Sequence, residues 1–350
     1  MTSLANSRIA KWDNAKAFLI LVVVFGHGLS PFINDDVTRW ADLWLNSFHM
    51  PLFVFLGGMF SKKNIDTVPF KYDKAVGFLL LSLFMKLLSF LSVLLCGGNA
   101  SFSLFEENGV AWYIFAMAIH LMIAHLLRSF SHGKVLVTSI LLATGAGYID
   151  QIGNTLVLSR IIVFFPIFYL GYITDQNKLF EILNKKWIRI CSLILFMGFT
   201  VGIFLVIDKI YSLRYVLTGN NPYYEFGEDW YPFGALLRLG CYALSAVLGF
   251  AILSITPNKK LPLVTHCGTK TLQIYALHRA IQTVLDYTFL KDLLSPLRSK
   301  YILLITLGIS VVLTLVLSLK PFEYIIYPCT HWRKFFAPVI NWYKNKQTTE

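Results

Sequence analysis

Histidines inside long apolar stretches are the residues of this chain best suited to chemistry. His27 lies in the stretch 16–33, and His49 lies in the stretch 43–60. Ionisable residues are costly inside a bilayer, so they mark functional candidates there. A neutral imidazole can accept a proton from a hydroxyl group that attacks an acyl carbon, which is general-base catalysis. If the two stretches are consecutive antiparallel helices, both imidazoles lie roughly 8 Å below the outer boundary, at about 1.5 Å per residue.

Lys16 is predicted to share a helix face with His27, from which it is separated by eleven residues. Eleven steps of about 100° return to within about 20° of the starting direction, roughly 16 Å along the axis. Asp13 can pair with the Lys16 ammonium. This stripe suits a donor shaped like coenzyme A, whose phosphates would bind Lys16 while its reactive end reaches His27. The alternative is a boundary lysine that snorkels and a histidine that is only packed.

A second group of polar residues lies in the stretch 270–289. Tyr275 and His278 are three residues apart, so they share a helix face. Arg279 follows His278, and a buried arginine requires a partner or water. Arg160 begins another apolar stretch at its outer end. It could bind an anionic or sugar ligand there, and interfacial anchoring explains it equally well.

Other residues of reactive types are interpreted as structural. The segment from His49 continues with Met-Pro-Leu, and its proline frees a backbone carbonyl, while Gly57 and Gly58 are interpreted as packing residues. His120 and His125 are four residues apart without an acidic or cysteine partner. The five cysteines are widely spaced. The sequence therefore predicts neither a metal site nor a disulfide framework.

The composition indicates what must position these residues. The chain has 350 residues, of which 56% are hydrophobic and 14% are charged, with a mean hydropathy of +0.61. A soluble domain has about 25% charged residues, so this is a membrane protein. Runs of roughly 20 apolar residues cross a bilayer as helices. We therefore expect an all-α polytopic bundle, a single domain over residues 1–350, with a basic cytoplasmic tail at 320–350.

Ten membrane spans are predicted, and they share long apolar runs between charged or turn-rich breaks. The spans are 16–33, 43–60, 76–97, 110–127, 134–149, 158–174, 188–207, 235–255, 270–289 and 301–319. With a cytoplasmic N-terminus, about two thirds of the basic residues fall inside, as the positive-inside rule predicts. The net charge of +12 then follows from topology and does not indicate nucleic acid. Both termini are predicted to be cytoplasmic.

The longest predicted outer loop spans residues 208–234 and is rich in aromatic and acidic residues. Such residues can stack on sugar rings and hydrogen-bond to sugar hydroxyls. An interfacial aromatic belt explains the same composition equally well. No internal repeat is visible, which weakens a transporter interpretation.

The chain resembles the acyltransferase-3 superfamily of membrane acyltransferases, in the branch of fucose 4-O-acetylase-like and capsular or exopolysaccharide O-acetyltransferases. Segments through most of the chain match family motifs. They are Trp12-Asp13 through Lys16 to Gly26-His27, His49-Met-Pro through Gly57-Gly58, Trp112-Tyr-Ile-Phe, Arg160 with Phe164 to Gly171, and Gly268 to His278. Many relatives have arginine at Lys16 and serine at Gly57. Some relatives carry a fused hydrolase-like domain, and we expect acyl transfer here to depend on the membrane bundle alone.

The resemblance implies an enzyme in the plasma membrane that moves an acetyl or other acyl group from cytoplasmic acyl-CoA to a sugar hydroxyl. The acceptor is a surface glycan or its lipid-linked precursor. His27 and His49 are the implied catalytic residues, with His27 as general base or transient acyl carrier, and Lys16 and Asp13 hold the donor. Trp112, Arg160, Tyr275 and His278 support the acceptor side. A polytopic glycolipid transporter is one alternative, and acyl-CoA dependence distinguishes it from the enzyme. A non-catalytic membrane scaffold is the other, and replacement of His27 would then have no effect.

Overall fold

The computed structural model describes residues 9–106, 109–153, 155–220 and 222–338. Within these residues the chain is helical, and no strand is present apart from a single bridge between Glu106 and Thr155. The all-α prediction is therefore confirmed. The end of the predicted basic tail, 339–350, lies outside the described residues, and residues 320–335 of that tail are largely helical.

Each predicted span overlaps one of ten helices, although in the span 43–60 this helix covers only residues 49–59. The ten helices are α1 (Ala10–Leu29), α3 (His49–Met59), α5 (Asp73–Leu95), α6 (Trp112–Leu127), α7 (His132–Ala146), α8 (Leu158–Ile173), α10 (Lys186–Leu205), α13 (Gly234–Ile255), α15 (Thr271–Leu285) and α17 (Ser299–Leu317). Shorter helices used below are α2 (Asp36–Asn46), α9 (Gln176–Leu183), α14 (Pro262–Thr269), α18 (Lys320–Thr330) and α19 (Trp332–Phe335).

Among the described residues, five helices are long and apolar enough to cross a membrane by themselves. These five are α1, α5, α10, α13 and α17. A sixth span results if α8 and α9, which meet at an angle of 89°, count as one. The count of ten spans and the cytoplasmic termini stay predictions.

The predicted continuous helix over 43–60 is wrong, because the chain breaks between α2 and α3 at Ser47 and Phe48. The cause lies in Pro51, which has no N–H to donate to the carbonyl four residues earlier. That carbonyl belongs to Ser47, and the Ser245 hydroxyl of α13 donates to it at 2.7 Å instead. The break places His49 at the first turn of α3.

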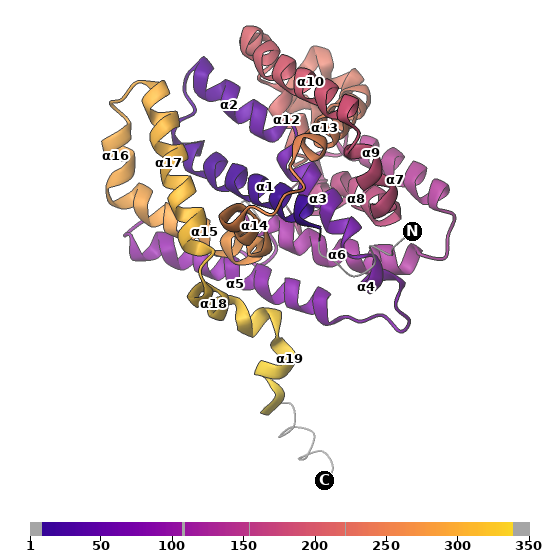
Figure 1. The fold of residues 1–350 in the computed structure, drawn as a ribbon. Helices are drawn as coiled ribbons and strands as arrows, with labels where there is room; N and C mark the ends of the chain where they lie inside the picture. The colour runs from indigo at the N-terminus through magenta and orange to yellow at the C-terminus, as the bar shows by residue number, and fades with distance from the viewer. Residues whose placement is uncertain (1–8, 107–108, 154, 221, 339–350) are drawn as a thin grey trace.

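Helix α1 lies at the centre of the bundle, packed against α14, α15, α17 and α3 (Figure 1). Its first turn is fixed by Lys11, whose buried ammonium donates to the backbone carbonyls of Leu253, Ser254 and Thr256 at the end of α13. A Cβ atom on Gly268 would lie 1.8 Å from the carbonyl oxygen of Asp13. Gly268 therefore permits the close approach of α14 to α1.

Helices α3 and α8 approach each other through two glycines. A Cβ on Gly58 would lie 2.0 Å from the Phe168 carbonyl oxygen, and a Cβ on Gly171 would lie 2.0 Å from the Phe55 carbonyl oxygen. Helices come this close only where small residues face each other. The packing interpretation of Gly58 is confirmed, and this contact fixes α3, the helix of His49, against α8, the helix of Arg160.

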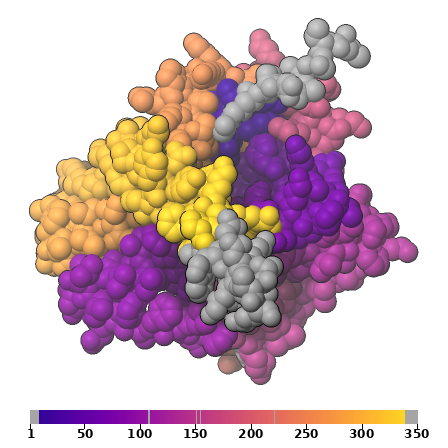
Figure 2. Space-filling model, turned by 90° about the horizontal axis from the view of Figure 1, so that it is seen from below, coloured from indigo at the N-terminus to yellow at the C-terminus, as the bar shows by residue number. Residues whose placement is uncertain are grey.

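The two ends of the bundle differ in structure. The predicted outer loop contains short helical turns, and the Tyr223 side chain is buried there and donates to the Thr144 carbonyl. Trp230 in the same loop is 53% exposed, so both interpretations of this loop stay open. At the other end, seen from below, the C-terminal segment lies across the surface, where α18 and α19 pack on α5 (Figure 2).

Candidate active site

His27 of α1 faces His278 of α15. Their ring centroids are 5.3 Å apart, and the planes are inclined by 40°. His278 is fully buried, whereas His27 is half-buried and retains some access to its surroundings. The Tyr275 ring lies 5.7 Å from the His278 ring. Residues that are 251 positions apart in sequence therefore form one polar cluster inside an apolar bundle.

The local helix fixes the tautomer of His278. Its Nδ1 atom lies 2.9 Å from the Tyr275 carbonyl oxygen and 3.2 Å from the Ile274 carbonyl oxygen. A carbonyl can only accept, so Nδ1 carries the proton, and Nε2 of the neutral ring has a lone pair. Nε2 is buried and has no hydrogen-bond partner among the described residues. His278 thus offers a fixed hydrogen-bond acceptor beside His27.

Two further residues of α15 hold the helix of His27 in place. Arg279 donates to the backbone carbonyl of His27 at 3.2 Å, and Gln282 donates to the carbonyl of Val24 at 2.7 Å. Arg279 also lies 3.6 Å from the Asp286 carboxylate, which supplies the partner that a buried arginine requires. These contacts fix the His27 backbone relative to His278.

His49 and Arg160 complete the surroundings of His27. Both interact electrostatically with His27, as do His278 and Arg279. His49 Nδ1 bonds to the carbonyl of Leu45 at 2.6 Å, which fixes its ring at the start of α3. The Arg160 guanidinium lies 4.7 Å from the centroid of the Trp112 ring, a cation–π contact between α8 and α6.

A cavity of about 210 Å³ connects the Lys16 end of α1 with Tyr275. Five helices supply its lining residues, which are Lys16, Ile20, Phe53, Leu56, Gly57, Phe60, Lys74, Phe78, Tyr113, Ile114, Met117, Thr271, Leu272 and Tyr275. Lysine side chains lie at one end, and the Tyr113 and Tyr275 rings, 5.2 Å apart, lie within it. His278 is one helical turn beyond Tyr275. The cavity thus leads from two cations towards the paired imidazoles.

Two lysines lie at one end of this cavity: Lys16, which the sequence predicted as a site residue, and Lys74, which it did not. Lys16 pairs with the buried carboxylate of Asp13 at 2.8 Å, and its ammonium lies 5.5 Å from the Phe60 ring centroid. Lys74 enters the same cavity from α5 and donates to the Ser61 hydroxyl at 3.0 Å. In the sequence, Lys74 is only one of many basic residues on the predicted inner side.

Eight residues were predicted from the sequence to belong to the site. His49, Arg160 and His278 each lie close enough to His27 for their charges to act on its ring. Tyr275 joins this cluster to the cavity that Lys16 lines, and Trp112 joins it through Arg160. Asp13 joins through its ion pair with Lys16. The missed residues are Lys74, Tyr113 and Gln282, whereas Arg279 was predicted to need a partner but received no role in the site.

The other membrane histidines have separate roles. His120 is buried and bonds to the Ile161 carbonyl at 2.9 Å, and His125 bonds to the Ile65 carbonyl at 2.7 Å. Each links its helix to a neighbouring segment. These contacts agree with their structural interpretation.

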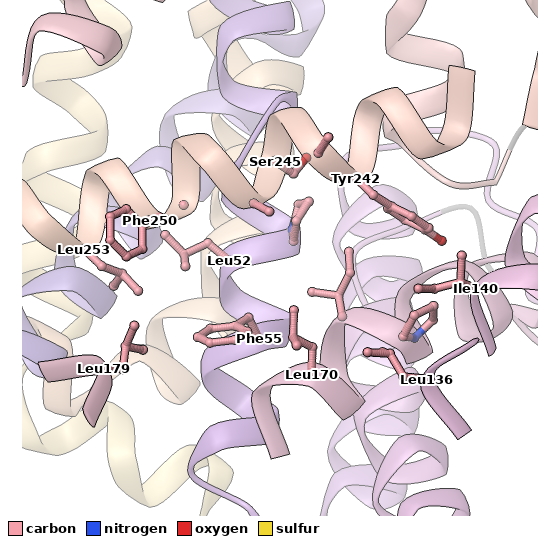
Figure 3. A pocket seen from close by; sticks show the side chains of 16 residues that line it. Leu52, Phe55, Leu136, Ile140, Leu170, Leu179, Tyr242, Ser245, Phe250 and Leu253 are labelled. Atoms are coloured by element: carbon pink, nitrogen blue, oxygen red, sulfur yellow. The ribbon is translucent and has the colours of Figure 1, made fainter. Parts of the chain in front are cut away.

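A second, larger cavity lies on the opposite face of α3 (Figure 3). Its volume is about 420 Å³, and its lining is almost entirely apolar. Phe53, Leu56 and Gly57 of α3 face the first cavity, whereas Pro51, Leu52 and Phe55 face the second. Helix α3 therefore separates two cavities.

The fold and the polar site define a membrane protein that holds paired bases beside a cavity with a cationic end. A family model described as an acyltransferase domain, that of the acyltransferase-3 family, matches residues 9–320. The chain belongs to this family and is a membrane acyltransferase, which confirms the resemblance at the level of the superfamily. No curated protein and no solved structure matches the chain in the corresponding comparisons.

Proposed function

We propose that this protein transfers an acetyl group from cytoplasmic acetyl-CoA to a sugar hydroxyl of a surface polysaccharide or its lipid-linked precursor, in the plasma membrane. The observation that carries the proposal is the cavity that links Lys16 and Lys74 to Tyr275, one turn from the His27–His278 pair. Coenzyme A has phosphates at one end and a thioester at the other. The polarity of the cavity matches that order.

The donor binds with its phosphates at the two ammonium groups, which are suited to phosphate oxygens as charge-assisted donors. Asp13 holds Lys16 in place through their ion pair. The pantetheine arm then follows the apolar wall past Met117 and Tyr113. The thioester carbon comes to rest near Tyr275, within reach of the histidines.

His27 acts as the general base. The sugar oxygen attacks the thioester carbon, its proton moves to the bare nitrogen of His27, and the new C–O bond forms. Nε2 of His278 accepts the other N–H of His27, which fixes the reactive tautomer, much as a carboxylate does in a catalytic triad. Hydrogen bonds of this kind often tighten only when substrate binds. The C–S bond then breaks, and His27 returns the proton to the coenzyme A sulfur.

Two arginines near His27 affect the charges that develop during the reaction. Arg279, which donates to the His27 backbone carbonyl, and Arg160, which packs on Trp112, supply positive charge near the His27 imidazole. The same charges favour the negative charge that develops on the acyl oxygen in the transition state. His49 borders the entry for the acceptor, with Arg160 and Trp112 opposite.

The test measures transfer of labelled acetyl from acetyl-CoA to the host's glycan in membranes that contain the wild-type chain at known abundance. We expect an alkali-labile acetyl ester on the glycan. A His331→Gln variant serves as a control and should transfer acetyl as the wild type does, because that histidine is exposed on the C-terminal segment. Glycan movement across the membrane without any acetyl-CoA-dependent ester would contradict the proposal and favour a transporter.

A further inference from the structure

The larger cavity has an apolar lining that suits a hydrocarbon chain. Figure 3 shows side chains from α3, α7, α8, α9 and α13 converging on it, among them Leu52, Phe55, Leu170 and Leu253. Two hydroxyl groups are present in its wall. The Tyr242 hydroxyl donates to the Val163 carbonyl, and the Ser245 hydroxyl donates to the Ser47 carbonyl. A water molecule needs two to four polar partners, so this wall does not suit water.

The shape of the cavity suits one extended chain. Along α13 its lining runs from Tyr242 to Leu253, eleven residues or roughly 16 Å at about 1.5 Å per residue. Ala243 and Ala246 line it and are exposed at the surface of the helix, so the cavity opens sideways between small side chains. In a membrane protein, such an opening faces lipid chains.

One end of the cavity lies beside the candidate active site. Pro51, in its lining, is two residues from His49 on α3. Tyr242 bonds to Val163, which is one helical turn from Arg160 on α8. Both His49 and Arg160 interact electrostatically with His27. Helices α3 and α8, two of the five that line the cavity, therefore carry His49 and Arg160 within about one helical turn of its wall.

From this arrangement we propose that the cavity binds the hydrocarbon tail of the acceptor, a glycan linked to its lipid through phosphate. The tail lies along α13, the phosphate lies at Arg160, and the sugar hydroxyl reaches His27. An arginine suits this position because its guanidinium binds phosphate oxygens in pairs. Helix α3 then separates the donor, on the Lys16 side, from the tail of the acceptor. This inference rests on the proposed function and narrows its acceptor to the lipid-linked form.

The experiment compares two acceptors with one set of variants. The acceptors are the host's lipid-linked glycan and the same glycan freed from its lipid by mild acid. Ala246→Phe fills the opening of the cavity, and Ala243→Leu is a second filling variant. Val247→Phe is the matched control, because Val247 is 47% exposed on the same helix and does not line the cavity. We expect the filling variants to reduce transfer to the lipid-linked glycan at least tenfold. Transfer to the freed glycan should be unchanged, and Val247→Phe should change neither.

Two results would overturn the inference while leaving the proposed function intact. The first is equal transfer to the lipid-linked glycan by wild type and both filling variants. The second is an equal loss for both acceptors in both filling variants, since the tail would then have no separate part. Absence of transfer by wild type to either acceptor would instead contradict the proposed function.

A binding measurement distinguishes a polyprenyl phosphate from bulk phospholipid as the occupant of the cavity, and it does not require enzymatic turnover. A photoreactive polyprenyl phosphate in phospholipid vesicles should label α3 or α13 of the wild-type chain. We expect unlabelled polyprenyl phosphate to compete and Ala246→Phe to abolish the labelling. Competition by excess phospholipid of equal strength would assign the cavity to bulk lipid, and labelling that Ala246→Phe leaves unchanged would place the tail elsewhere. Either result would refute the inference.

Discussion

Replacement of His278 by leucine tests the proposed hydrogen bond between His278 Nε2 and the catalytic His27. His278 is fully buried, and its Nδ1 atom is held by two carbonyls of its own helix, so only Nε2 is available to His27. Leucine fills a similar space without any nitrogen. In the proposed mechanism, the substitution removes the acceptor that orients His27 and stabilises the imidazolium formed during proton transfer.

The size of the effect follows from one hydrogen bond to a charged group, which is worth about 1.5–3 kcal/mol. At about 1.36 kcal/mol per tenfold change in rate, kcat should fall about 10- to 160-fold. The KM for acetyl-CoA should stay near the wild-type value, because His278 does not line the donor cavity. A loss in kcat without a change in KM indicates an interaction made mainly in the transition state.

The assay is acetyl transfer by purified protein in lipid vesicles, measured over a range of acetyl-CoA concentrations. His278→Gln is the informative companion, because its amide oxygen can accept the His27 N–H and should restore part of kcat. Nitrogen-15 NMR of labelled histidines with acetyl-CoA bound gives a second readout, in which the leucine variant should show His27 as a mixture of tautomers. A leucine variant with kcat within twofold of wild type, or with the His27 tautomer unchanged, would refute the reasoning.

Three other predictions concern donor binding and packing. Lys16→Gln and Lys74→Gln should each raise the KM for acetyl-CoA about tenfold or more by loss of one charge-assisted contact, and titration with acetyl-CoA would show unchanged affinity if the cavity does not bind the donor. Lys11→Met should lower the free energy of unfolding by about 3 kcal/mol, because three buried carbonyls lose their donor. Its thermal unfolding in detergent is the check, and a wild-type transition would contradict that assignment. Gly58→Ala should abolish the tight contact of α3 with α8 and reduce folded yield, whereas Gly198→Ala, with nothing within 4 Å of its added Cβ, should not.

Residue type and spacing predicted much of the candidate site. His27 and Lys16 are recognisable because ionisable residues in apolar stretches are rare and costly. The freed carbonyl before Pro51 was also predictable, since proline lacks an N–H wherever it occurs. The sequence alone does not reveal that Ser245, almost 200 residues later, donates to that carbonyl.

The remainder depends on packing between distant helices. Lys74 looks like any basic residue near a helix end until α5 packs beside α15 and brings it into the cavity of Lys16. The orientation of His278 towards His27 likewise follows from the contact of α15 with α1. The break between α2 and α3 was missed because the apolar pattern continues across it. Hydrophobicity sets which residues enter the membrane, but it does not set where a helix ends inside it.

The most direct measurement of the central claim is acetyl transfer by His27→Ala with donor binding measured in the same sample. The account predicts that the variant binds acetyl-CoA as wild type does, because His27 does not line the donor cavity, while transfer to glycan falls at least a hundredfold. Transfer at the wild-type rate by a variant that binds acetyl-CoA normally would contradict the assignment of His27 as the base.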